Sequence, residues 1–191
     1  MGGAAPKVCA EAPKLRPGGA KIGGRRCLCD SERRSALIRE ATVGDIGDLV
    51  RLSELLWPGH DAGVLEEELL CDLRDADAAC FLSLRDADPN DPGSGEEAVG
   101  FAWCRLRRDY VEGTESSPVG YLEGIFVDER FRGRGHARML VGACEAWAVS
   151  KGCSEFASDC ELDNGESLAF HLACGFAEAN RIICFAKRLD S

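Results

Sequence analysis

The chain has 191 residues, of which 33 are acidic and 23 are basic, so its formal net charge is -10. This length predicts one domain, and a composition of 45% hydrophobic and 29% charged residues is typical of a globular protein. The acidic balance argues against a general nucleic-acid-binding protein, because phosphate backbones are bound by Lys and Arg, and no run of about 18 apolar residues offers a membrane-spanning helix. An acidic surface instead attracts cationic partners.

The first 35 residues differ in composition from the rest. Residues 1–35 carry eight basic and three acidic side chains, which leaves 15 basic and 30 acidic side chains for residues 36–191. Residues 1–35 are also rich in Gly and Pro, and they show neither the period of a strand nor that of a helix. They lack the apolar run of a secretory signal peptide. We therefore expect a basic, mostly unstructured leader followed by one acidic domain over residues 36–191.

The domain begins with a predicted strand over residues 36–41. Thr42 and Asp45 then have the spacing of a capping box, in which two side chains satisfy free backbone N–H groups at the start of a helix. The helix that follows is amphipathic, and Pro58 requires it to end before that residue. Its apolar side chains recur at helical spacing: Ile46, Leu49, Val50, Leu52 and Leu56.

A second, acidic helix is predicted over residues 65–73. Two strands follow at residues 79–84 and 98–106. The loop between them, residues 86–97, is rich in Asp, Pro and Gly, which is typical of an exposed hairpin connection. Residues 107–118 are polar and irregular.

The C-terminal half alternates between strands and helices. Strands are predicted at residues 119–127 and 154–160, and helices at residues 135–151 and 164–173. A terminal β segment or hairpin is predicted over residues 176–189. This order of elements favours a mixed α/β architecture built on one sheet.

The 11 cysteines form no C-x-x-C pair, and their number is odd. Several fall on apolar positions of the predicted elements, where a free Cys behaves as a small buried hydrophobe. We therefore expect free cysteines, no metal site and a reducing compartment, which indicates a cytoplasmic protein.

A turn with two glycines connects the predicted strand 119–127 to the predicted helix 135–151. Gly133 and Gly135 allow close approach of backbone N–H groups to a ligand, and a helix N-terminus adds a positive dipole, so the turn suits an anion. The G-K-[ST] of a P-loop is absent. The alternative is a glycine-rich helix start with solvated arginines. Five basic residues gather here: Arg130, Arg132, Arg134, His136 and Arg138.

The spacing R-x-x-G-x-G over residues 130–135 resembles the pyrophosphate motif of the GNAT acyl-CoA N-acetyltransferase superfamily. Further segments are similar, more narrowly, to the aminoglycoside 6'-N-acetyltransferases. These segments are LWPGH (56–60), RDYVEGTESSPVGYLEGIFV (108–127), FASDCELDN (156–164) and FHLACGF (170–176). They cover most of residues 36–191, and their combination is far more specific than the turn alone.

The resemblance implies an α/β (α+β) GNAT fold, with a mixed, mostly antiparallel sheet that is splayed between strands 4 and 5 and flanked by about four helices. It implies acetyl-CoA as co-substrate, seated in the splay with its pyrophosphate on the turn. Main-chain groups of residues 125–127 would contact the pantetheine arm and the thioester. The implied cofactor-binding residues are Ile125, Phe126, Val127, Arg132, Gly133, Arg134, Gly135, His136, Ala137 and Asn164.

The resemblance also implies that an aminoglycoside or another polycationic amine binds beside the cofactor. The implied acceptor residues are Trp57, His60, Tyr110, Glu123, Asp159 and Asn180. Asp159 is implied as the catalytic base, acting through a water, with Glu123 as its partner. Glu123 also stands out without the resemblance, because it lies inside an apolar strand, where a carboxylate is rare unless it is paired.

The other acceptor positions have plainer alternatives. Trp57 is equally explained as part of the core, His60 as a hydrogen-bonding loop residue, Tyr110 as a solvated aromatic and Asp159 as a turn-forming residue. Two further functions remain open for the chain. One is a GNAT enzyme that acts on a polyamine, an amino sugar or a protein amine, and the other is an acyl-CoA-binding module without turnover.

Two positions depart from the family pattern. Phe185 stands where relatives often carry an aromatic hydroxyl that protonates the departing thiolate. Asn180 stands where relatives often place a carboxylate that faces the sugar, so one contact with the cation is missing. The resemblance further implies a homodimer.

Overall fold

The structure is a computed structural model that describes residues 37–85 and 96–189. Residues 1–35, for which a leader is expected, lie outside this range, as do most residues of the loop at 86–97. The described part contains a five-stranded sheet in the order β1-β2-β3-β4-β5, in which β1 to β4 are antiparallel and β5 is parallel to β4. The strands are β1 (Leu37–Glu40), β2 (Ala78–Arg85), β3 (Glu97–Arg107), β4 (Val119–Val127) and β5 (Phe156–Ser158).

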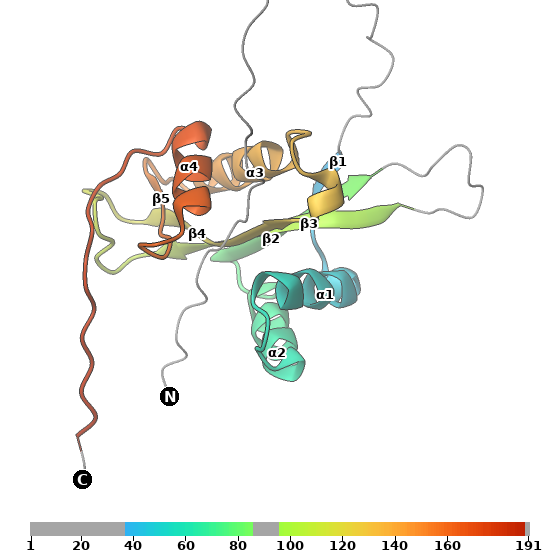
Figure 1. The fold of residues 1–191 in the computed structure, drawn as a ribbon, viewed down its shortest axis with the longest axis horizontal. Helices are drawn as coiled ribbons and strands as arrows, with labels where there is room; N and C mark the ends of the chain where they lie inside the picture. The colour runs from blue at the N-terminus through green and yellow to red at the C-terminus, as the bar shows by residue number, and fades with distance from the viewer. Residues whose placement is uncertain (1–36, 86–95, 190–191) are drawn as a thin grey trace, which may run out of the picture.

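Helices cover both faces of this sheet, with α1 and α2 on one face and α3 and α4 on the other (Figure 1). The helices are α1 (Ile46–Leu56), α2 (Ala62–Asp72), α3 (His136–Ser150) and α4 (Gly165–Cys174), and two short 3-10 turns are η1 (Val43–Asp45) and η2 (Glu129–Phe131). The expected mixed sheet with four flanking helices is thus confirmed. No helix of the described part is long and apolar enough to cross a membrane.

The start of α1 follows the predicted capping box. The carboxylate of Asp45 accepts a hydrogen bond from the Thr42 backbone N–H at 2.8 Å and another from the Thr42 hydroxyl at 2.9 Å. Arg39 of β1 binds the same carboxylate through both terminal nitrogens, and this pairing holds the pKa of Asp45 well below its usual range. The capping box therefore ties the first strand to the first helix.

The second helix begins earlier than predicted, at Ala62 instead of residue 65. The Asp61 side chain accepts hydrogen bonds from the backbone N–H groups of Gly63 and Val64, at 2.9 and 3.1 Å. An Asp in this N-cap position satisfies donors that the first turn leaves free, so the helix starts where the cap is, before its apolar stripe begins.

Two apolar layers hold the sheet between its helices. Leu49 and Leu52 of α1 and Leu65 of α2 are buried against Phe101 on one face. On the other face, α3 packs on β3 and β4 through buried side chains of the helix and of the sheet: Leu140, Val141, Cys144, Cys104 and Leu122. These cysteines are free and buried, as expected for small apolar residues.

The sheet opens between β4 and β5. Only three residue pairs join these strands, from Gly120 with Phe156 to Leu122 with Ser158. Beyond Leu122, β4 continues to Val127 with β3 as its only described neighbour. The predicted splay between strands 4 and 5 therefore begins directly after Leu122.

The terminal β segment predicted over residues 176–189 is wrong for the described chain, because residues 175–189 form no strand. Phe176 still packs against Phe156 and His171, but the chain then runs away from the sheet in an extended form (Figure 1). The alternation of apolar residues favours a strand, but a strand also needs a neighbour for its backbone groups, and the described residues offer none. The strand predicted at 154–160 is likewise shorter, at Phe156–Ser158.

Candidate active site

The turn after β4 is open and contains two glycines in the left-handed conformation. Gly133 and Gly135 have φ values of 73° and 91°, in the left-handed region that favours glycine, and a Cβ atom at either residue would meet no neighbouring atom within 4 Å. Gly135 is also the N-cap of α3, and among the described residues no side chain caps it. The first turn of α3 therefore directs backbone N–H groups toward open space, which fits a pyrophosphate.

The arginines around this turn are not equivalent. Arg130 binds the Asp128 carboxylate, and the Nε of Arg132 donates to the Val127 carbonyl at 3.0 Å, which fixes the end of β4. Arg134 is exposed and lies 5.4 Å from the Phe131 ring. Arg134 is thus the member of this group best placed to meet an anion.

His136, the first residue of α3, turns its side chain inward. Its Nδ1 lies 2.7 Å from the hydroxyl of Ser83 on β2, and its ring packs edge-on against Phe131. Burial lowers the pKa of His136, and the charge of Arg134 adds to this effect. His136 and Ala137 can therefore serve an anion through their backbone N–H groups, while the imidazole anchors the turn to the sheet.

The remaining expected cofactor residues lie along the opening. Ile125 and Val127 are buried and Phe126 is half-buried, and all three belong to the part of β4 beyond its pairing with β5. Asn164, from the next helix, caps α4 by accepting from the Ser167 backbone N–H at 2.9 Å. The part of β4 that is not paired with β5, which is called its free side below, therefore leads directly into the turn.

Glu123 occupies a bulge in β4. Trp103 of β3 pairs with Gly124 and Cys104 pairs with Leu122, which leaves Glu123 as an extra residue. Bulges of this kind re-aim a side chain and are common next to active sites. Glu123 is only 4% exposed, and burial raises the pKa of its carboxyl group.

Arg107, at the end of β3, pairs with this buried carboxylate. Its Nη2 lies 2.9 and 2.8 Å from the two Glu123 oxygens, and its Nε lies 3.1 Å from Oε1. The same guanidinium carbon lies 3.4 Å from the centre of the Tyr121 ring. Arg107 therefore joins two neighbouring side chains of β4.

Tyr121 connects this pair to Asp159. The pKa of Tyr121 is raised, first by burial and then by the negative charge of Asp159, with which its hydroxyl also hydrogen-bonds. Asp159 directly follows β5 and is exposed. Asp159 is thus at the surface, whereas Glu123 is buried and paired with Arg107.

Ser158 and His171 fix the point at which β4 and β5 separate. The Ser158 hydroxyl lies 3.0 Å from His171 Nε2 and 3.3 Å from the Leu122 carbonyl oxygen. His171 Nδ1 lies 2.7 Å from the Ser167 carbonyl oxygen, and burial lowers the pKa of this histidine. Helix α4 thereby holds the residue before Asp159 against the residue before Glu123.

Trp57 and His60 lie at the end of α1. Trp57 is 5% exposed and packs edge-on against Phe101 and Trp103, and a side chain at Gly124 would approach its ring to 2.7 Å. Trp57 therefore packs in the core directly beside the Glu123 bulge. His60 is exposed, and its Nδ1 lies 3.2 Å from the Trp57 carbonyl oxygen, as expected for a hydrogen-bonding loop residue.

Tyr110 and Asn180 meet at a third residue. The Tyr110 hydroxyl donates to Glu112 at 2.8 Å, and the Asn180 side-chain amide donates to the other oxygen of Glu112 at 2.8 Å. Tyr110 is 81% exposed. The structure thus joins Tyr110 and Asn180 in one exposed cluster, and within the described chain the hydrogen bonds of this cluster do not extend to Glu123 or Asp159.

Sequence reasoning missed Arg107, Tyr121 and Glu112. The signal for Arg107 was present, because a carboxylate inside an apolar strand requires a partner and a basic residue stood at the end of the neighbouring strand. The bulge that turns Glu123 toward Arg107 had no such signal, because it depends on the register between β3 and β4.

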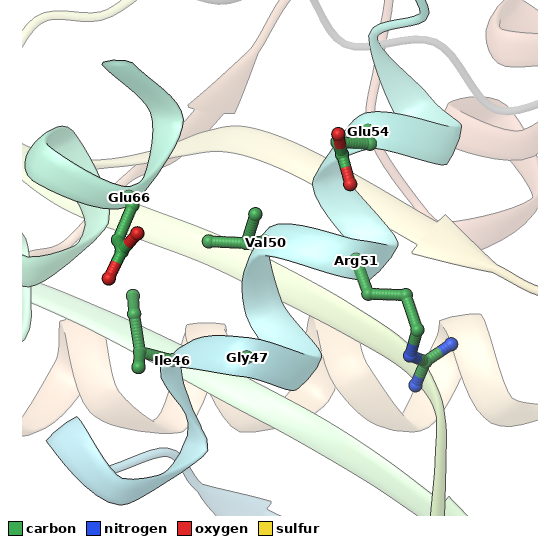
Figure 2. Close-up of a pocket in the computed structure, with 6 residues that line it drawn as sticks. All are labelled: Ile46, Gly47, Val50, Arg51, Glu54 and Glu66. Atoms are coloured by element: carbon green, nitrogen blue, oxygen red, sulfur yellow. The ribbon is translucent and has the colours of Figure 1, made fainter. Parts of the chain in front are cut away.

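An open hollow lies elsewhere, between α1 and α2. It is lined by Ile46, Gly47, Val50, Arg51, Glu54 and Glu66 (Figure 2). None of the expected site residues lines it, and it lies on the outer side of the helices that cover the first apolar layer. The hollow is therefore separate from the candidate active site.

The chain is similar to known proteins in sequence and in fold. Residues 49–176 match the family model described as the acetyltransferase (GNAT) family. An aminoglycoside N(6')-acetyltransferase type 1 from Stenotrophomonas maltophilia is 42% identical over 153 residues, which are 80% of this chain and 94% of that protein. A protein of the same description from Salmonella typhimurium is 42% identical over 139 residues, which are 72% of this chain and 88% of that protein.

A solved structure shows the same fold. The aminoglycoside acetyltransferase AAC(6')-Iy, in complex with the bisubstrate analogue CoA-S-monomethyl-acetylneamine, has 37% sequence identity and a TM-score of 0.74, with coverage of 81% of this chain and 99% of that one. AAC(6')-Ih from Acinetobacter baumannii has 35% identity and a TM-score of 0.72, with coverage of 82% and 100%. The chain therefore belongs to the GNAT acetyltransferase family.

Proposed function

We propose that this protein transfers the acetyl group of acetyl-CoA to the 6'-amine of aminoglycoside antibiotics, and that it thereby confers resistance to them. The observation that carries this proposal is the similarity, over most of both chains, to a structure that holds a CoA–aminoglycoside analogue. Charge supports it independently, because residues 36–191 carry 30 acidic against 15 basic side chains. A polycationic acceptor is attracted to such a surface, while the basic turn suits the anionic co-substrate.

Acetyl-CoA supplies an activated acetyl thioester to this site. We assign the turn over residues 132–137 to its pyrophosphate and the free side of β4 to its pantetheine arm and carbonyl. Backbone donors on β4 suit the carbonyl oxygen, which gains negative charge in the transition state. Asn164, as the cap of α4, completes this proposed cofactor site.

The acceptor amine must lose a proton before its nitrogen bonds to the acetyl carbon and the C–S bond breaks. An ammonium like that of Lys has a pKa of about 10.4 and an ordinary Asp carboxyl about 3.9, so direct transfer is uphill by roughly 9 kcal/mol. Asp159 is exposed, so its first task is to bind and orient the ammonium, and it then takes the proton through a water.

The departing thiol needs no dedicated acid. Its pKa is about 8.5, so a thiolate can leave near neutral pH and take up a proton from solvent. Phe185, which stands where relatives often carry an aromatic hydroxyl, is 91% exposed and belongs to the C-terminal segment that forms no strand. We therefore assign no catalytic role to residue 185.

The remaining acceptor residues are assigned to the sugar. Trp57 packs beside the Glu123 bulge, and Tyr110, Asn180 and His60 are exposed. These assignments rest on the family positions together with the placements described above.

Thiol release tests the proposed function. Purified protein with acetyl-CoA is offered aminoglycosides that carry a 6'-amine, polyamines, and peptides with Lys or a free N-terminus. We expect thiol release with the 6'-amino compounds and little with the others. Thiol release with peptides or polyamines alone would show that the enzyme acetylates another class of amine. Release with none of the compounds would indicate an acyl-CoA-binding module without turnover.

We also propose a homodimer in the cytoplasm, where acetyl-CoA is available, with residues 1–35 as a leader outside the catalytic domain. Support for the dimer comes from the extended C-terminal segment. It exposes a row of apolar side chains, namely Ile182, Ile183, Phe185 and Leu189, which a second copy would cover.

A further inference from the structure

A guanidinium holds the buried carboxylate of the acceptor site. Arg107 makes three hydrogen bonds to Glu123, all between 2.8 and 3.1 Å, and its guanidinium carbon lies 3.4 Å from the Tyr121 ring centre. Stacking on one side and a two-pronged ion pair on the other fix the orientation of both groups. The Arg107 side chain is one-third exposed and that of Glu123 is 6% exposed, so the pair sits at the border of solvent.

The contacts with Arg107 leave the Glu123 carboxylate with a free hydrogen-bond acceptor position. A carboxylate has about four acceptor positions, and Arg107 uses three of them. An ammonium is only a donor, so it needs a free acceptor position on an ionised carboxylate. A protonated carboxyl group would instead present an O–H donor toward the ammonium.

Other charged groups also face Glu123. Arg105 and the Cys104 thiol lie on β3, Asp159 follows β5, and Tyr121 lies on β4 beside it. From α1 the neighbour is the uncharged Trp57 ring at Gly124. Arg107 is the one of these groups that hydrogen-bonds to the Glu123 carboxylate, so its removal changes the environment most.

We propose that Arg107 is a positioning residue for acceptor binding, which keeps Glu123 ionised and aims its remaining acceptor position at the ammonium of the substrate. Burial favours the neutral form of Glu123, and the charge and hydrogen bonds of Arg107 oppose burial. This inference rests on the proposed function, because it assumes a cationic acceptor.

The opposite effect of Arg107 is repulsion of the cationic substrate. Repulsion is the smaller effect here, because the guanidinium charge is already compensated by Glu123 at hydrogen-bond distance. Without Arg107 the buried carboxyl takes up a proton, and the site then gains no negative charge but loses an acceptor. Removal of Arg107 should therefore weaken binding of the acceptor.

The test measures the KM for an aminoglycoside in Arg107→Gln and in the wild type at each pH from 6 to 9. The quantity compared is the ratio of the variant KM to the wild-type KM. We expect a ratio of about tenfold or more at pH 6, as for loss of a charged hydrogen bond, and a ratio within about threefold at pH 9, where Glu123 ionises without help. The KM for acetyl-CoA should stay unchanged. Glu123→Gln should raise the KM at every pH with no such recovery.

The matched control is Arg108→Gln, which removes the same charge from the next residue. Arg108 points away to Asp77 and is exposed, so its ratio should stay near one at every pH. Arg107→Lys serves as a second variant that retains a charge, and it should show the same trend with a smaller rise. A ratio for Arg107→Gln or Arg107→Lys that is below one, or flat across pH, would overturn the inference.

A measurement without substrate separates this inference from the proposed function. In protein labelled with 13C at the Glu carboxyl groups, the Glu123 signal is the one that Glu123→Gln removes. We expect an ionised signal at pH 7 in the wild type and a protonated one in Arg107→Gln. If both are ionised, the inference is wrong even where the enzyme is active; if no aminoglycoside is acetylated by the wild type, it is the proposed function that fails.

Discussion

Asp159 and Glu123 are two carboxylates of the proposed site in opposite surroundings. Glu123 is buried in a bulge and paired with Arg107, whereas Asp159 is exposed and hydrogen-bonded by Tyr121. Opposite surroundings of this kind allow two acidic residues to take different tasks. We assign fixed binding of the cation to Glu123 and orientation with proton transfer to Asp159.

Replacement of Asp159 by Asn tests this division of tasks. The variant keeps the shape of the side chain but removes its charge and its ability to accept a proton, so kcat/KM for an aminoglycoside should fall about 100-fold. The control is Asp163→Asn, an exposed carboxylate four residues away, which should behave as the wild type. A change of only a few-fold for Asp159→Asn between pH 6 and 9 would remove Asp159 from the role of base.

At the scale of elements, the turn and α3 form one unit. Gly135 combines a φ of 91° with the N-cap position of α3, and its surroundings are open. A side chain there meets no neighbour, so its effect is confined to the backbone that the turn must adopt.

Gly135→Ala should therefore raise the KM for acetyl-CoA while the fold is retained. The left-handed conformation costs a non-glycine residue roughly 1–2 kcal/mol, which corresponds to about a tenfold higher KM for acetyl-CoA. Gly142→Ala is the matched control, because Gly142 lies within α3, also has open surroundings, and is not in the left-handed region. Steady-state kinetics and a thermal melt of both variants provide the measurement. Equal KM values for the two variants would contradict the role of the turn.

The helices and strands differ in how far each could be predicted from its own local sequence. The capping box at Thr42 and the apolar side of α1 depend on residues three or four apart, so both were predictable. The start of α2 was missed because the cap at Asp61 outweighs the position of the apolar residues. The bulge at Glu123 and the absence of a strand over residues 176–189 depend on pairing between distant segments, which no local pattern contains.

The candidate site shows the same limit. The turn residues and both carboxylates were predicted from family motifs, but the contacts of the carboxylates with Arg107 and Tyr121 were not. Phe185 was expected to stand near the chemistry and instead lies on the exposed C-terminal segment. Residues that act through contacts across the sheet become visible only when the register is known.

Two buried histidines couple the stability of the whole molecule to pH. Burial lowers the pKa values of His136 and His171, so near pH 6 the unfolded chain binds more protons than the folded one. The free energy of unfolding should therefore fall as the pH drops below about 6.5, the pKa of an unperturbed histidine, by at most about 1.4 kcal/mol per pH unit for each histidine.

Thermal melts between pH 5 and 7.5 measure this effect. His171→Asn should have a shallower fall of Tm with acid than the wild type, because one of the two titrating groups is gone. Asp45, which is paired with Arg39, has a lowered pKa and loses its contribution only at more acidic pH, so it does not obscure the window. Parallel curves for the variant and the wild type would show that His171 does not titrate with unfolding.

The extended C-terminal segment bears on the state of assembly. Ile183 is 77% exposed, and we propose that a second copy covers it. Ile183→Lys should shift the protein toward monomer in light scattering coupled to gel filtration, since a buried charge opposes association. Val149→Lys, at a site on α3 that is 69% exposed, is the control and should leave the assembly unchanged. A monomeric wild type, or a dimer that both variants retain, would contradict this arrangement.

The whole molecule combines a basic turn with an acidic domain, and we propose that this arrangement acetylates one amine of an aminoglycoside. Neomycin and paromomycin test this central claim most directly, because they differ in carrying an amine or a hydroxyl at the 6' position. With acetyl-CoA and purified protein, we expect thiol release and a singly acetylated product from neomycin, with the acetyl group at 6' by NMR, and negligible release with paromomycin. Equal release with both compounds, or release with neither, would contradict the claim.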